Sequence, residues 1–420
     1  MTPPGYKQTE VGVIPDDWDV VKLGDLIEYT KGYPFRSDEY AKDGVRIVRV
    51  SDTSYDSILE ENPIFIPENK ARQYAKWRLR TDDLIISTVG SKPPMYDSMV
   101  GKVILISQQN EGALLNQNAV LIRDKKKRAY VQQILLTHCR SKRYLTWIES
   151  IFRGNANQAS ITLKELFEFP VPFPDTDVEQ RAIATALSDV DALLAALDRL
   201  IAKQRDLKQA AMQQLLTGQT RLPGFTGKWE TKRLGEIAEM GSGGTPPSSV
   251  SSYYDGDIPW VSISDMTSGG KVIMSTDRNL TRSGFTNSAA QMFPVGTVLY
   301  AMYASLGECS VAGIPLCTSQ AILGIRPKDR LDGEFLYYYL TSLKAFVKSL
   351  GQQGTQSNLN KGMVQDFRLS LPPLPEQTAI ATVLSDMDAE LAALEQRRDK
   401  TRALKQGMMQ ELLTGRTRLV

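Results

Sequence analysis

Glu179–Leu222 has the sequence EQRAIATALSDVDALLAALDRLIAKQRDLKQAAMQQLLTGQTRL, and Glu376–Leu419 has the sequence EQTAIATVLSDMDAELAALEQRRDKTRALKQGMMQELLTGRTRL. The two stretches are identical at 29 of 44 positions without a gap, so the chain contains a duplicated module. Apart from Gly407, neither copy has Gly or Pro before its closing Leu-Leu-Thr-Gly, and both are rich in residues that favour helices. Each copy is predicted to form one helix of about 40 residues and about 60 Å.

Apolar residues in each copy recur in alternating steps of four and three, a pattern that turns one narrow seam toward a partner helix. The seam comprises Ile183, Leu187, Val190, Leu194, Leu197 and Ile201 in the first copy, and Ile380, Leu384, Met387, Leu391 and Leu394 in the second. Thr176 and Glu179 have the spacing of a capping box, and Gly218 and Gly415 are placed to end the helices. A coiled coil with a purely structural role fits the same pattern, so the open question is what the helices hold apart.

A segment of about 150 residues precedes each helix, and the two segments resemble each other only in outline. The traceable correspondences include Trp18–Leu26 with Trp229–Ile237 and Asn116–Arg123 with Thr318–Arg326. Short β-branched runs bounded by Gly, Asp, Asn and Ser predict strands, and helices are expected near 129–152 and 333–350. We therefore predict an α/β fold with two globular domains and two long antiparallel helices, related by an internal pseudo-two-fold repeat. The predicted domains are 1–175, the helix 176–218, 219–375 and the helix 376–420.

The composition is ordinary for a folded globular protein, with 42% hydrophobic and 23% charged residues. The sequence shows neither a membrane span nor a signal peptide, so a cytoplasmic location is expected. Cys139, Cys309 and Cys317 have no metal-ligand spacing, which predicts free thiols and no zinc. The formal net charge of +2 argues against a protein that grips long nucleic acids unaided.

The residue patterns of common catalytic sites are missing from the sequence. The single histidine, His138, is expected to be a surface or hydrogen-bonded residue rather than a catalytic one. The sequence contains no phosphate loop of the Gly-x-x-x-x-Gly-Lys-Ser/Thr type and no Asn/Asp-Pro-Pro-Phe/Tyr methyltransferase motif. Lys125–Arg128 is interpreted as a solvated loop, with phosphate contact as the alternative. The sequence predicts a protein without a catalytic site or a metal site.

The order of domain, helix, domain and helix resembles the specificity subunit of Type I restriction-modification systems. The motifs that carry the resemblance are Tyr6–Trp18, Leu215–Trp229, Gly241–Pro246 and Leu371–Gln377, and it covers the whole chain. The resemblance implies that each domain is a target recognition domain for one half of a bipartite double-stranded DNA site, and that the helices set the gap. It also implies antiparallel helices that return the carboxyl terminus toward Tyr6–Trp18, echoing the Arg221–Trp229 junction.

The partners that the resemblance implies are modification subunits, two of them, and restriction subunits. S-adenosylmethionine would belong to the modification subunits, which methylate adenine, and ATP and Mg²⁺ to the restriction subunits, which cleave DNA. The chain itself is expected to bind no cofactor. Because its net charge is near zero, we expect it to bind its DNA site tightly only together with these partners.

Base reading requires Arg, Lys, Asn, Gln, Ser or Thr on positioned loops, and two amide-rich stretches occupy corresponding places before the helices. The candidates in these stretches are Arg153, Asn155, Asn157, Gln158, Gln352, Gln353, Thr355, Gln356 and Asn358. Further candidates follow equivalent strands or lie near the amino terminus: Tyr33, Arg36, Ser91, Lys92, Tyr96, Tyr303 and Ser305. A polar surface turn is the alternative for each stretch. The alternative for the whole chain is a coiled-coil adaptor that joins protein partners and reads no bases.

Overall fold

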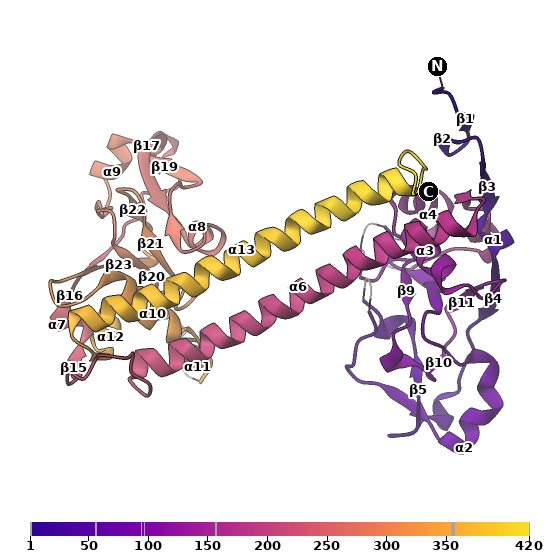
Figure 1. The fold of residues 1–420 in the computed structure, drawn as a ribbon. Coiled ribbons are helices and arrows are strands. Elements are labelled where there is room, and N and C mark those ends of the chain that lie inside the picture. Colours follow the sequence, from indigo (N-terminus) through magenta and orange to yellow (C-terminus); the bar gives the residue numbers. More distant parts are fainter. Residues whose placement is uncertain are drawn as a thin grey trace. The chain divides into compact units, whose positions relative to one another are not determined.

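The computed structural model describes residues 2–54, 57–93, 95, 97–155, 158–353 and 358–419, with only the backbone described at 350–353. The chain divides into two compact units. Unit 1 comprises Met1–Leu197 and Arg397–Val420, and unit 2 comprises Asp198–Gln396. Both unit boundaries fall inside long helices, α6 (Asp177–Thr217) and α13 (Leu374–Leu412), which Figure 1 draws in magenta and yellow.

Unit 1 is built around a four-stranded antiparallel sheet in the order β4-β11-β7-β9. The strands of unit 1 are β1 Tyr6–Thr9, β2 Gly12–Pro15, β3 Trp18–Lys22, β4 Ile27–Lys31, β5 Val45–Val48, β6 Ile64–Ile66, β7 Leu84–Ser87, β8 Val89–Gly90, β9 Val103–Leu105, β10 Leu114–Leu115, β11 Ala119–Asp124, β12 Arg153–Asn155, β13 Gln158–Ser160 and β14 Pro170–Pro174. Its shorter helices are α1 Leu23–Leu26, α2 Glu68–Ala71, α3 Ala129–Cys139, α4 Lys142–Ile151 and α5 Leu163–Phe167. Small sheets β10-β5-β6, β12-β13-β8 and β14-β3 surround the central one.

The central strands are buried on both faces because their alternate side chains enter different cores. Leu84 and Ile86 belong to a core shared with α3, α4 and the first turns of α6, while Ile85 belongs to a second core with Ile104 and Leu121. Alternation along a strand sends successive side chains to opposite faces, so an unbroken apolar run is what a doubly covered strand requires. This explains why the run from Leu84 to Ile86 shows no polar alternation.

Unit 2 repeats this plan with a five-stranded sheet in the order β16-β23-β20-β21-β18. Its strands are β15 Glu230–Arg233, β16 Ala238–Ser242, β17 Tyr254–Val261, β18 Val272–Ile273, β19 Arg278–Leu280, β20 Val298–Ala301, β21 Cys309–Ala312, β22 Cys317–Thr318, β23 Ile322–Pro327 and β24 Arg368–Leu371. Its shorter helices are α7 Leu234–Ile237, α8 Ile263–Ser268, α9 Arg282–Thr286, α10 Gly333–Ser342, α11 Lys344–Gln353 and α12 Lys361–Gln365. Helix α10 contacts β20 and β21, as α3 contacts β11 and β9 in unit 1 (Figure 1).

The two long helices pair antiparallel within each unit, as predicted. In unit 1, Ile183 and Leu187 near the start of α6 share a core with Leu412 at the end of α13. In unit 2, Leu216 near the end of α6 shares a core with Ile380 near the start of α13. Equivalent ion pairs cross between the helices, Lys405 with Asp191 in unit 1 and Lys208 with Asp388 in unit 2. The predicted seam residues are all buried or half-buried.

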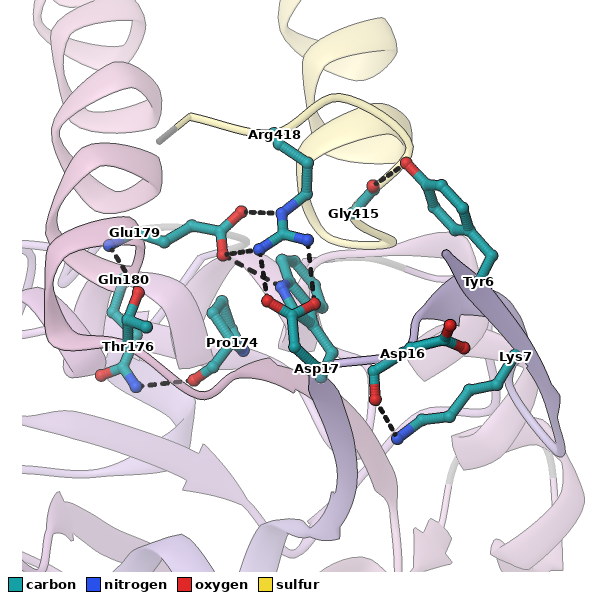
Figure 2. Close-up of polar contacts among 11 residues, drawn as sticks. Tyr6, Lys7, Asp16, Asp17, Pro174, Thr176, Glu179, Gln180, Gly415 and Arg418 are labelled. Carbon is teal, nitrogen blue, oxygen red and sulfur yellow. Dashed lines mark hydrogen bonds and ion pairs between the residues drawn. The ribbon is translucent and has the colours of Figure 1, made fainter. Parts of the chain in front are cut away.

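In unit 1, a buried carboxylate near the start of α6 binds the residues that follow α13. Figure 2 shows the Arg418 guanidinium between the carboxylates of Glu179 and Asp17, and the Trp18 indole donates to Glu179 Oε2 at 3.0 Å. Tyr6 Oη also donates to the Gly415 carbonyl at 3.1 Å. The end of the chain is therefore held against Tyr6–Trp18, which confirms the predicted return of the carboxyl terminus.

Unit 2 contains the same arrangement in the segment that leads from α6 to β15. Arg221 binds Glu376, and Trp229 Nε1 donates to Glu376 Oε2 at 3.1 Å. Glu179 and Glu376 are both fully buried. We call these two arrangements the Trp-Glu-Arg clamps, formed by Trp18, Glu179 and Arg418 in unit 1 and by Trp229, Glu376 and Arg221 in unit 2.

Two expectations about helix ends need correction. Only half of the predicted capping box forms: Glu179 N–H donates to Thr176 Oγ1 at 3.3 Å, while the Glu179 carboxylate is engaged in the clamp instead of turning back to Thr176. The helical segment expected near 129–152 is two helices, α3 and α4, because Ser141 caps the start of α4 by accepting from Tyr144 N–H. The segment near 333–350 likewise divides into α10 and α11.

Candidate DNA interface

Three predicted candidates in unit 1, Arg153, Asn155 and Gln158, lie in one small sheet, and a fourth, Ser91, directly follows one of its strands. Strand β13 pairs with β12 and with β8, and Gln158 lies opposite Asn155 at the end of the β12–β13 hairpin. Ser91 follows β8 directly and accepts a hydrogen bond from Ser98. The amide-rich hairpin and the segment after β7 were separate candidates in the sequence, and the structure places them on neighbouring strands.

A hollow of about 490 Å³ lies beside this sheet. Its lining combines the apolar Val50 and Val89 with two cations, one carboxylate and several hydroxyl and amide groups: Arg49, Lys102, Asp97, Ser51, Thr53, Ser91, Ser98, Asn116, Gln117 and Asn118. Lys102 Nζ donates to the carbonyls of Thr53, at 2.6 Å, and Asp97, at 2.5 Å, so it ties two loops together at the hollow. Burial lowers the pKa of Lys102 to about 8. Such a surface offers donors and acceptors of the kinds that phosphates and base edges require.

The backbone around this hollow is closely packed, and glycine permits it. Gly32 N–H donates to the Ala119 carbonyl at 2.9 Å, and a Cβ atom on Gly32 would lie 1.8 Å from the Asn116 carbonyl oxygen. Thr88 N–H donates to the Asn118 carbonyl at 2.8 Å, and Ile161 N–H donates to the Thr88 carbonyl at 3.1 Å. The turn 116–118 is thus bound to the segments after β4 and β7.

Unit 2 makes equivalent backbone hydrogen bonds with different side chains, although its loop after β20, which closes at Gly307, is shorter than the loop after β7, which closes at Gly101. Gly243 N–H donates to the Ile322 carbonyl at 3.2 Å, and a Cβ atom on Gly243 would lie 2.2 Å from the Thr318 carbonyl oxygen. Met302 N–H donates to the Ala321 carbonyl at 2.8 Å, and Leu359 N–H donates to the Met302 carbonyl at 3.0 Å. The predicted candidates Tyr303 and Ser305 follow directly, and Tyr303 is exposed.

Other predicted candidates have positions that differ in their accessibility. Tyr33 packs against Phe35, Tyr74 and Trp77 in an aromatic cluster, and its backbone pairs with Asn116. Arg36 is exposed and pairs with Asp38, and Arg153 is exposed and pairs with Glu165.

The remaining candidates are exposed or lie beyond what the structure describes. Lys92 and Asn358 are exposed. The backbones of Gln352 and Gln353 form the last turn of α11. Tyr96, Asn157, Thr355 and Gln356 lie outside the described residues.

The reactive side chains outside these loops are buried. His138 is 1% exposed, and burial together with nearby Arg143 lowers its pKa to about 3. Burial raises the pKa of Cys139 and of Cys317 to about 12, and it raises that of Cys309 further. In the described part of the chain, no group of three or more His, Cys, Asp or Glu residues is placed to hold a metal ion. No described helix has the length and apolar character needed to cross a membrane.

Sequence reasoning missed Arg49, Lys102 and the turn residues Gln117 and Asn118 as parts of this surface. Gln117 and Asn118 lie in a stretch that was recognised only as a repeated strand, and both are exposed. Their amide side chains, directly before the start of a predicted strand, could have indicated that they belong to this surface. Arg49 and Lys102 gave no such signal, because only the packing of distant loops brings them to the hollow.

Comparisons with known proteins agree with this architecture. The family model described as the Type I restriction modification DNA specificity domain matches residues 15–204 and again 226–402. The putative type I restriction enzyme MjaX specificity subunit of Methanocaldococcus jannaschii is 26% identical, over 99% of this chain and 97% of that protein.

Two solved structures have a similar fold. The Type-I restriction-modification system S subunit from M. genitalium has a TM-score of 0.58 at 16% identity, over 98% of this chain and 99% of the other. A chain from a structural study of assembly and conformational transition of the type I R-M system has a TM-score of 0.57 at 20% identity, over 96% and 99% of the two chains. With two matches of the family model covering most of its length, the chain belongs to the family of Type I restriction-modification DNA specificity subunits.

Proposed function

We propose that each unit reads one half of a split DNA site, and that α6 and α13 set the length of the unspecified gap between the halves. One observation carries this proposal. Both units hold a turn, 116–118 or 319–321, by equivalent backbone hydrogen bonds, with loops of different length and with different side chains around it. A shared framework with divergent side chains suits two readers of different base sequences.

The chemistry on DNA would belong to partner subunits. Modification subunits, two per chain and one for each unit, would bind S-adenosylmethionine and methylate adenine, and restriction subunits would use ATP and Mg²⁺ to cleave DNA. The buried positions of His138 and of the three thiols support a chain without catalytic groups of its own, because no substrate can reach them. The complex would act where the chromosome is, in the cytoplasm.

The nearly balanced charge adds a requirement for these partners. Protein–DNA affinity comes largely from neutralised phosphates, and a net charge of +2 over 420 residues supplies little of it. We therefore expect the isolated chain to bind its site weakly and the complex with modification subunits to bind it tightly.

Mapping of methyladenine tests the proposal. The chain is co-expressed with its modification subunits in a host that lacks adenine methylation, and the genomic DNA is sequenced with detection of methylated bases. The expected result is one motif of two fixed blocks around an undefined gap. A continuous motif would contradict the split site, and unmethylated DNA from an assembled complex would favour the adaptor function.

A further inference from the structure

Two glutamines occupy equivalent positions on the loop frameworks of the two units. In unit 1 the Asn118 carbonyl accepts from Thr88 N–H at 2.8 Å, and the residue before it is Gln117. In unit 2 the Ala321 carbonyl accepts from Met302 N–H, also at 2.8 Å, and the residue before it is Gln320. The equivalent hydrogen bond therefore gives the two glutamines corresponding positions in their units, although the residues around them differ.

Both side chains are exposed, and neither carboxamide makes a hydrogen bond to any residue that the structure describes. Glutamines with structural roles in this chain behave differently. Gln132 accepts from Asp124 N–H and donates to two carbonyls, and Gln180 and Gln377 bind carbonyls at the starts of α6 and α13. The carboxamides of Gln117 and Gln320 thus keep both the donor and the acceptor available to a ligand.

The backbones that carry these glutamines are fixed. Gln117 N–H donates to the Tyr33 carbonyl at 3.0 Å, and Gln320 N–H donates to Thr245 Oγ1 at 3.3 Å. The close approaches at Gly32 and Gly243 hold the same turns from the side. A free amide on a restrained turn has little backbone entropy to lose on binding, which suits a residue that must discriminate between ligands.

The groups around Gln117 have the chemistry of a surface that binds base edges. The turn borders the hollow lined by the hydroxyl and amide groups of Ser98 and Asn118. The two cations there are already partnered, because Arg49 pairs with Asp52 and Lys102 donates to two carbonyls. Ser91 lies on the same hollow, and in unit 2 Ser305 lies in the loop that follows β20. A glutamine carboxamide can bind the N6 and N7 atoms of adenine together in the major groove.

We propose that Gln117 and Gln320 are equivalent base-reading residues, each contacting the adenine of one A·T pair in the half-site of its own unit. This assignment rests on the proposed function and deepens it by naming one residue in each unit that determines specificity.

The test uses the complete complex of this chain with its modification subunits, purified as wild type, Gln117→Ala and Gln320→Ala. Methylation rates are measured on duplexes that carry the mapped motif and each of its single-base substitutions. We expect Gln117→Ala to lose about 10-fold to 100-fold of discrimination at one A·T position of one block and Gln320→Ala to do so in the other block. Gln109→Ala alters another exposed glutamine of unit 1, which does not line the hollow, and should leave every position unchanged.

Three outcomes would overturn the assignment: unaltered discrimination, relaxation at a position without an A·T pair, or an equal loss of rate on all duplexes. The last outcome would indicate a role in folding or phosphate contact, and melting curves of the complexes would distinguish these. Failure of the wild-type complex to methylate any split motif would refute the proposed function instead, before the variants are compared.

Discussion

At the scale of single residues, the Trp-Glu-Arg clamps place a carboxylate where water does not reach. Removing one partner of a buried ion pair leaves an uncompensated charge, which costs about 3–5 kcal/mol. Arg418→Met should therefore destabilise unit 1 by about that amount and lower its melting temperature, measured by scanning calorimetry. Arg416→Met is the matched control, because Arg416 is exposed and its ion pair with Glu411 spans 3.8 Å, so less than about 1 kcal/mol is expected. Equal effects of the two variants would contradict a stabilising clamp.

His138 provides a second residue-scale prediction. Burial, together with nearby Arg143, lowers its pKa from the ordinary value of about 6.5 to about 3 in the folded protein, so the folded state binds fewer protons between these pH values. Stability must then fall as the pH drops from 6.5 toward 3, by about 1.4 kcal/mol per pH unit. His138→Gln removes this titration. The free energy of unfolding of the wild type, relative to that of the variant, should therefore fall by about 2 kcal/mol as the pH drops from 7 to 5. Parallel pH profiles for the two proteins would show that His138 does not titrate in this way.

These two residues also show what the sequence could not predict. Arg418 and Trp18 are 400 positions apart in sequence, and nothing in either stretch indicates their contact except the homologous Arg221–Trp229 junction, where the chain is continuous. The family resemblance and the duplicated junction therefore predicted the return of the carboxyl terminus, whereas the contact between these two side chains had no signal of its own. The burial of His138 could not be predicted from the sequence. Helix α3 is apolar around most of its circumference, so its sequence does not indicate which face is buried.

At the scale of elements, the long helices were predicted to within two residues at their starts, because Pro and Gly exclude helix on either side of them. The second helix does not fill the expected segment 376–420. It ends at Leu412, shortly before Gly415, the glycine predicted to end it, which has a φ of +67°, and the residues after Gly415 turn back to form the clamp.

The continuity of α6 and α13 through the unit boundaries yields a prediction at this scale. Insertion of one heptad at the boundary in both helices, after Leu197 and after Gln396, preserves the apolar seam. Seven residues add about 10 Å of helix, which is about three base pairs of DNA. The methylated motif should keep both blocks while its gap grows by about three positions, and an active variant with an unchanged gap would refute the role of the helices as spacers.

At the scale of the whole molecule, the sequence predicted the repeat, the fold class and the family, because one duplication left the helices nearly identical and the domains different. The side chains of the candidate surface were less accessible to prediction. Gln158 and Ser91 are candidates that amide-rich and post-strand positions predict, whereas Arg49 and Lys102 join the candidate surface only through tertiary packing of loops distant in sequence. A surface assembled from several loops carries no continuous sequence motif.

The central claim is that each unit independently reads one half of the site, and an exchange of one domain tests it most directly. Residues 18–170 are replaced by the corresponding segment of another specificity subunit, and methyladenine is mapped in cells that co-express the modification subunits. The account predicts that one block of the motif changes while the other block and the gap stay the same. A change in both blocks, or in neither, would contradict it.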